Sequence, residues 1–190
     1  MSESVGEKRV RFKGGWWLMM LLLLASHGEA QRLGIVGRAA PAWEVPVWMN
    51  LPEGMKGLEP GDLEGRVIYL FFFQSWCPGC HSHGFPSLQA VEERFRDNRE
   101  VVFAAVQTVF EGHGTNTEQR AKDSVEEYGL PIPVGHVAGE EGSSPGIMRR
   151  YRTGGTPWTV IIDRKGIVRF DGFSIEPSAA IEVVEKLLLE

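Results

Sequence analysis

A run of seven consecutive apolar or aromatic residues, 67–73, is the strongest feature in the hydrophobic pattern of the chain. An unbroken apolar run between turn-forming residues is typical of a strand that is buried on both faces. Residues 101–109 have the same character, and the alternation of apolar and polar residues over 43–48 indicates a short edge strand, a position that tolerates Pro46. Further short strands are predicted at 133–138, 159–162 and 167–170.

Apolar residues at helical spacing alternate with these strands. Leu88, Val91 and Phe95 fall at i, i+3 and i+7, which predicts a helix over about residues 78–97. Further helices are predicted around Ala121 to Tyr128, over 146–152 and from Pro177 onward. The order strand–helix–strand–helix, followed by a hairpin and a closing helix, indicates an α/β domain.

The first thirty residues have the pattern of a secretory signal. Residues 16–25 are all apolar, and Gly28 and Ala30 then approximate the small-residue pattern of a signal-peptidase cleavage site. Four cations come before the apolar run: Lys8, Arg9, Arg11 and Lys13. Because a bilayer span needs ~20 apolar residues, this run is short for a membrane crossing. We expect residues 1–30 to be a signal peptide, with an uncleaved anchor as the alternative, and the protein to be exported, either periplasmic or anchored facing the periplasm.

Length and composition leave room for one folded domain after this segment. The chain has 190 residues, of which 43% are hydrophobic and 24% charged, so a largely disordered chain is excluded. Residues 31–40 show little apolar periodicity and are expected to be a loose leader, which assigns 41–190 to the domain. The net charge of -5 argues against nucleic acid, because phosphate binding needs concentrated Lys and Arg.

The two cysteines of the chain, Cys77 and Cys80, lie where the first buried strand gives way to the predicted helix. Free N–H groups and the positive end of the dipole at a helix N-terminus stabilise a thiolate, and thiols placed there have pKa values lowered from ~8.5 toward ~3.5–7.5. We therefore expect Cys77 to attack a substrate disulfide and Cys80 to resolve the mixed disulfide. Pro78 and Gly79, between the thiols, help to set the reduction potential. The dithiol is itself the redox group, so no bound cofactor and no metal are expected.

The sequence resembles the thioredoxin superfamily, specifically the exported TlpA-like disulfide reductases, over about residues 41–189. The motifs that carry the resemblance are Ala40-Pro41-Ala42-Trp43, Trp76-Cys77-x-x-Cys80, Tyr128-Gly129-Leu130-Pro131 and Gly155-Thr156-Pro157. The resemblance implies a thioredoxin-like fold, in which helices flank a central mixed β-sheet with an N-terminal β extension. It also implies that Pro157 is a cis-proline facing the cysteines and that the Thr156 backbone is presented to the substrate as if to another strand.

The same resemblance implies an exported thiol–disulfide oxidoreductase that reduces disulfides in partner proteins. Its partners would be cysteine-containing exported proteins and a membrane electron-donor protein, and we expect a monomer. A dithiol of this kind serves reductases and oxidants alike, and the reduction potential distinguishes the two. Trp76 beside the cysteines is expected to support substrate docking. Trp158 either joins it in an apolar docking surface or belongs to the core.

Three positions depart from the family pattern and leave the proton-handling group open. Thioredoxins have an acid six residues before the first cysteine, where this chain has Phe71. Many TlpA-like reductases have Glu three residues after the second cysteine, where this chain has His83. The helix-kinking proline, Pro86, lies six residues after Cys80 instead of five, which predicts a local irregularity in the helix. His83, with His81 second, is the candidate base, and the alternative is that both are solvated surface residues.

Other uses of the same cysteines are weaker. A copper-binding chaperone would add a distant histidine, but no histidine stands out for this role, and His113 and His136 are candidates only by default. The haem-attachment pattern Cys-x-x-Cys-His is also matched, but it follows a buried strand here, and zinc would need a second cysteine pair. A peroxiredoxin would have Thr three residues before its cysteine, where this chain has Gln74.

The loop 111–117 follows the second buried strand. Ligand sites of parallel sheets lie beyond the carboxyl ends of the strands, so this loop is expected at the same edge as Cys77. It either shapes substrate access or is a flexible glycine turn.

Overall fold

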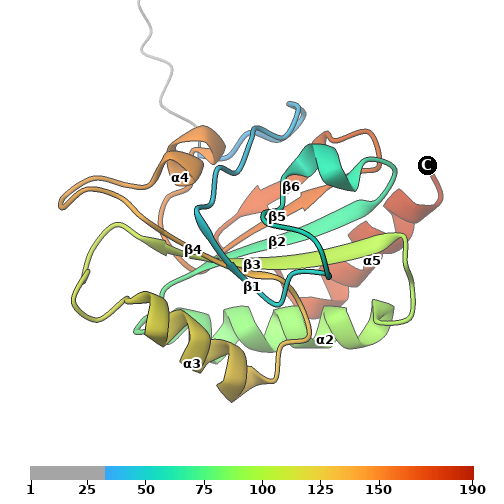
Figure 1. Ribbon diagram of the computed structural model, residues 1–190. Helices are drawn as coiled ribbons and strands as arrows, with labels where there is room; N and C mark the ends of the chain where they lie inside the picture. The colour runs from blue at the N-terminus through green and yellow to red at the C-terminus, as the bar shows by residue number, and fades with distance from the viewer. Residues whose placement is uncertain (1–32) are drawn as a thin grey trace, which may run out of the picture. The chain divides into compact units, whose positions relative to one another are not determined.

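The computed structural model describes residues 33–190 (Figure 1). The predicted signal peptide or anchor, residues 1–30, lies outside them. Among the described residues, no helix combines the length and the apolar character that a membrane crossing requires.

Six strands form one mixed sheet in the order β1-β4-β3-β2-β5-β6. The strands are β1 (Val47–Met49), β2 (Val67–Phe73), β3 (Val101–Val109), β4 (Val134–Ala138), β5 (Trp158–Ile162) and β6 (Val168–Gly172). Pairing is parallel between β2, β3 and β4, and antiparallel for β1, β5 and β6. The helices are α2 (Phe85–Phe95), α3 (Glu118–Tyr128), α4 (Gly146–Tyr151) and α5 (Pro177–Leu188). A 3-10 turn, η1 (Pro60–Leu63), and a π turn, η2 (Cys80–Gly84), complete the order. This is the predicted α/β arrangement.

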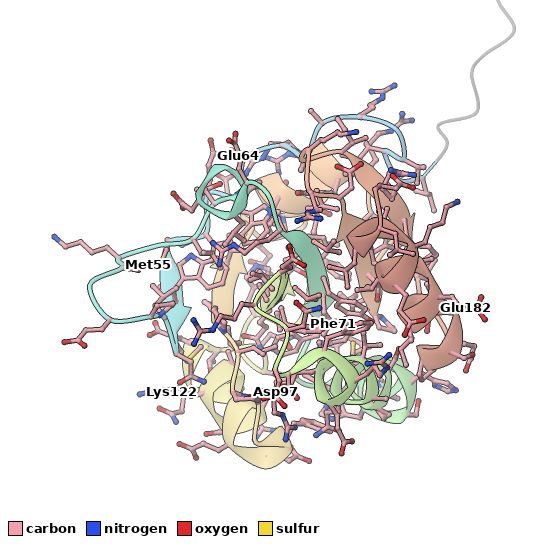
Figure 2. All side chains as sticks on the ribbon, turned by 90° about the vertical axis from the view of Figure 1, so that its right-hand side faces the viewer. Met55, Glu64, Phe71, Asp97, Lys122 and Glu182 are labelled. Carbon is pink, nitrogen blue, oxygen red and sulfur yellow. The ribbon has the colours of Figure 1, made fainter. Side chains whose placement is uncertain are left out.

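The central strand β2 divides the core into two layers because its side chains alternate between the faces of the sheet. Tyr69, Phe71 and Phe73 pack with the apolar faces of α2 and α5. Leu70 and Phe72 point the other way, toward α4 and the N-terminal segment. Figure 1 shows α2 and α3 on one side of the sheet and α4 on the other, and Figure 2 places Phe71 in the interior, next to α2. Burial on both faces explains why β2 is apolar at every position.

The expected edge strand 43–48 is shorter in the structure and begins only at Val47. Trp43 leaves the sheet and is fully buried, where its indole N–H donates to the Tyr151 hydroxyl at 3.0 Å. The Glu59 carboxylate accepts the Trp43 backbone N–H. A bulky aromatic therefore joins the N-terminal segment to α4, and strand pairing starts after Pro46, which has no N–H to give to a ladder.

Residues 33–40, expected to be part of a loose leader, are held along the sheet instead. The Gly37 N–H donates to the Val168 carbonyl at 2.8 Å, and the Ile35 N–H donates to the Asp171 carboxylate at 2.8 Å. Ile35 is buried. The segment covers the outer side of β6, which would otherwise expose unpaired backbone groups at the sheet edge, so the expectation of a loose leader is wrong for these residues.

Candidate functional site

The chain turns sharply between the end of β2 and the helix, and this turn presents Cys77. The Cys77 N–H donates to the Gln74 carbonyl at 3.1 Å, which closes the turn. Helical structure begins directly after Cys77, whose carbonyl accepts the N–H groups of Cys80 at 3.0 Å and of His81 at 3.3 Å. The first cysteine therefore lies at the helix N-terminus, as the sequence predicts.

The two sulfurs occupy different environments. Cys77 is 8% exposed as a residue, and its thiol donates to the Thr156 carbonyl at 3.5 Å, while the Cys80 backbone N–H donates to the Cys77 sulfur at 3.3 Å. Cys80 has no exposed surface, and burial, followed by its hydrogen bond with Cys77, raises the pKa of its thiol well above the ordinary range. The Cys77 sulfur thus lies between a backbone N–H of the helix start and the carbonyl of the Thr156 segment.

The cis-proline segment lies directly against the cysteine turn. The Thr156–Pro157 peptide bond is cis, as the resemblance implies. A Cβ atom at Gly79 would be 3.2 Å from the Pro157 Cδ atom, so the two segments approach through a position without a side chain. The structure thus brings Cys77, Gly79, Thr156 and Pro157 together.

The loop 111–117 shares this edge, as predicted. The Asn116 side-chain carbonyl accepts the Ser75 N–H at 2.9 Å and the Ser75 hydroxyl at 3.0 Å. Gly112 lies against the half-exposed Trp76, whose ring nitrogen would be 3.3 Å from a Cβ atom at Gly112. Asn116 is nearly fully buried and holds the residue that precedes Trp76. In the sequence, Asn116 is one polar residue of a glycine-rich loop, and no local signal there predicts a role at the site.

Trp158, for which two roles were open, belongs to the core. It is buried, and its indole N–H donates to the Asp171 carboxylate. Trp76 alone of the two extends the surface around the cysteines.

The two candidate histidines lie in different surroundings. His83 is exposed, and its ring contacts only the neighbouring Ser82 hydroxyl, at 2.7 Å. His81 is half-buried, and its Nε2 and Nδ1 atoms lie 2.7 Å from the Ser75 carbonyl and 2.6 Å from the Tyr128 hydroxyl. His81, not His83, is thus tied to the cysteine turn. Tyr128 appears in the sequence only as part of a family motif, without an assigned role.

The predicted irregularity of the helix is the π turn η2. The Phe85 N–H donates to the Cys80 carbonyl, a five-residue spacing that accommodates one extra residue before Pro86. The place of the family's buried acid is filled by Phe71, whose ring contacts that of Phe85 edge-on at 5.2 Å between centroids. An aromatic layer therefore lies where a carboxylate would otherwise receive a proton.

The histidines considered for a copper site point elsewhere. His113 donates from Nε2 to the Gly139 carbonyl at 3.0 Å, and the Nδ1 atom of His136 lies 2.6 Å from the Gln107 side-chain oxygen. Within residues 33–190, no three side chains of His, Cys, Asp or Glu gather as a metal site would require. The described residues therefore offer no set of ligands that joins the cysteines to a histidine.

Comparison with known proteins places this site in a family. The sequence profile of the AhpC/TSA family matches residues 36–171. The chain belongs to this family. Among solved structures, it is similar to a thioredoxin-like superfamily protein at 33% identity and a TM-score of 0.73, and to a thiol-disulfide isomerase from Corynebacterium glutamicum at 34% identity and a TM-score of 0.68. Each likeness covers 80% of this chain and 97% of the other, which confirms the predicted superfamily and the thioredoxin-like fold.

Two bacterial relatives of this AhpC/TSA chain are named as thiol-disulfide oxidoreductases. The thiol-disulfide oxidoreductases ResA of Bacillus thuringiensis (strain Al Hakam) and Bacillus anthracis are each 27% identical over 133 residues. These matches cover 70% of this chain and 66% of the length of each relative.

Proposed function

We propose that the protein is a thiol–disulfide oxidoreductase that reduces disulfides in partner proteins through Cys77 and Cys80. The arrangement of the cysteines is the observation that carries this proposal. One sulfur lies at a helix N-terminus within reach of a backbone N–H and next to the Thr156 carbonyl, and the other is buried directly behind it. The names of the relatives are consistent with the same chemistry.

The reaction exchanges disulfide bonds in two steps. The Cys77 thiolate attacks one sulfur of the partner's disulfide, and the other sulfur leaves as a thiolate. Cys80, after losing its proton, attacks the Cys77 sulfur of the mixed disulfide. The Cys77–Cys80 bond forms, the bond to the partner breaks, and the partner leaves with both of its sulfurs reduced. The dithiol supplies the two electrons, so the scheme requires no bound cofactor.

Exposed apolar side chains surround the cis-proline segment and fit a protein substrate. We call Leu33, Trp76 and Phe173 the apolar rim. These side chains are 56%, 45% and 48% exposed. Leu33 and Phe173 both lie against Gly154, two residues before Thr156, and Trp76 directly precedes Cys77. Exposed apolar surface next to a reactive group is typical of a site that docks another protein.

The export signal predicted from the sequence supports the choice of partners. The basic, apolar and small-residue order of residues 1–30 fits delivery to an oxidising compartment, where partner proteins form disulfides. There the protein would reduce cysteine-containing exported proteins, either in the periplasm or anchored facing it, and would receive electrons from a membrane donor protein.

The reduced protein, mixed with insulin, tests the proposed reaction. We expect stoichiometric reduction of insulin disulfides and formation of one Cys77–Cys80 disulfide, both measured by mass spectrometry after acid quenching. Equilibration with glutathione should give a reduction potential nearer ~-270 mV than ~-120 mV, as reductases of this superfamily have. The Cys77→Ser/Cys80→Ser double variant is the control. Insulin left oxidised by the wild-type protein would contradict the proposal.

Replacing Trp76 by alanine should weaken the reaction with proteins selectively. Removing an exposed aromatic anchor from an interface costs ~1–2 kcal/mol, so we expect kcat/KM for insulin to fall about 10-fold. The reaction with a small aromatic disulfide should be much less affected, because it buries little of the rim. Leu189→Ala, at an 89% exposed position after α5, is the matched control and should behave as wild type. Equal losses for insulin and for the small disulfide would contradict a docking role of Trp76.

A further inference from the structure

Cys80 has to lose a proton before it can resolve a mixed disulfide, because the thiolate is the nucleophile. Its side chain has no exposed surface, so bulk water does not contact the sulfur. Thioredoxins have an acid at the position of the buried Phe71, and many TlpA-like reductases have one at the position of the exposed His83. Another side chain near Cys80 is therefore needed to receive the proton.

The contacts of His81 define the tautomer of its neutral ring. A carbonyl oxygen only accepts hydrogen bonds, so the Nε2 atom, 2.7 Å from the Ser75 carbonyl, carries the hydrogen. In the neutral ring, Nδ1 is then the acceptor, and the Tyr128 hydroxyl donates to it at 2.6 Å. The neutral ring thus has a proton-accepting atom that is already hydrogen-bonded to a phenol, and the cation would remain bonded to a carbonyl through Nε2.

Tyr128 connects this histidine to the surroundings of Cys80. Its ring stacks on Phe85 at 4.1 Å between centroids, and the Phe85 N–H donates to the Cys80 carbonyl. Phe85 and Cys80 belong to one buried cluster, against which Tyr128 packs. Burial, with the charges of Glu127 and Cys80, raises the pKa of the Tyr128 phenol, so the hydroxyl keeps its proton and stays a donor to His81. The phenol is only partly buried, so a proton that reaches this pair can leave to solvent.

We propose that Tyr128 and His81 form the relay that receives the Cys80 proton in the resolving step. This inference rests on the proposed function. As the Cys80 S–H bond breaks, its proton passes to the Tyr128 oxygen, directly or through one water, and the Tyr128 proton passes to Nδ1 of His81. The Cys80 sulfur bonds to the Cys77 sulfur, and the partner's sulfur leaves with the electron pair. His81 then carries the positive charge, which the Ser75 carbonyl stabilises, until solvent takes the proton.

The histidine lies within the π turn. The turn η2 begins at Cys80, and the side chain of His81, its second residue, reaches back to Ser75, six residues earlier. Turns of this kind are frequent at functional sites.

Stopped-flow reaction with dithionitrobenzoate separates the two steps in one experiment. Attack by Cys77 releases one thionitrobenzoate, and attack by Cys80 on the resulting mixed disulfide releases the second. We expect Tyr128→Phe and His81→Gln to slow the second release by about 10-fold or more at neutral pH, the usual contribution of a positioned proton acceptor. The first release should be unchanged. Raising the pH should narrow the difference between wild type and both variants, because hydroxide then serves as the proton acceptor in the variants.

Tyr128→Phe keeps the stacked ring and removes only the hydroxyl, which separates proton transfer from packing. His83→Gln, at an exposed position of the same turn, is the control and should match wild type. A second release of wild-type rate in both variants, or a slowing of both releases together, would overturn the relay. If Cys80→Ser still gave two releases, the assignment of nucleophile and resolver would fail, which is a different result from failure of the relay.

Discussion

Replacing Cys80 by serine should accumulate partner proteins as mixed disulfides on Cys77, whereas replacing Cys77 by serine should trap none. The asymmetry follows from burial, since Cys77 keeps a small exposed fraction next to Thr156 and Cys80 has none. In wild type, Cys80 resolves the mixed disulfide within the same molecule, and well-oriented intramolecular groups act at effective concentrations of ~10⁵ M or more. Without Cys80, only free thiols in solution remain, so the lifetime of the complex should rise by several orders of magnitude.

Non-reducing gels of the purified variants after incubation with insulin, followed by mass spectrometry of the linked peptides, measure this effect. Serine is nearly isosteric with cysteine, so both variants should fold. The Cys77→Ser/Cys80→Ser variant is the control, because any partner protein found with it is retained without a disulfide bond. Equal trapping by the two single variants would contradict the assigned roles, and trapping by Cys77→Ser alone would reverse them.

Local sequence signals were sufficient for the fold and for the cysteines. The apolar run 67–73, bounded by turn-forming residues, indicated a doubly buried strand, and the Cys-x-x-Cys motif directly after it was therefore expected at the beginning of the helix, as the structure shows. The place of the loop 111–117 followed from the same geometry, because adjacent parallel strands end at one edge of the sheet. Such features depend on neighbouring residues and on general rules of sheet topology.

Features that depend on distant side chains could not be predicted in this way. Tyr128 lies 47 positions from His81, and neither residue shows in the sequence that the two rings meet. Trp43 alternates correctly for a strand, yet Tyr151, 108 positions away, draws it into the core. Spacing did indicate that the helix is irregular before Pro86, but only the structure shows that the irregularity is a π turn at Cys80.

Gly84→Ala tests whether the helix start, β2 and the cis-proline segment are packed as one unit. A Cβ atom at Gly84, the last residue of the π turn, would lie 2.5 Å from the Cζ atom of Phe71 and 3.0 Å from the Cβ atom of Pro157. Phe71 is fully buried against Phe73 and Phe85, so its ring has no free space to enter. We expect a loss of about 1–3 kcal/mol in the free energy of unfolding, the usual cost of overpacking a core, measured by urea denaturation.

Gly61→Ala is the matched control, since nothing lies within 4 Å of a Cβ atom there and alanine suits its 3-10 turn better than glycine. It should keep or slightly raise stability. Phe71→Leu in the Gly84→Ala background should recover part of the loss, because the smaller side chain makes room for the added methyl, although Phe71→Leu alone destabilises. A Gly84→Ala protein as stable as wild type would show that the layer beneath the cysteines is loose. A loss that Phe71→Leu fails to reduce would place the clash at Pro157, on the substrate side of the helix.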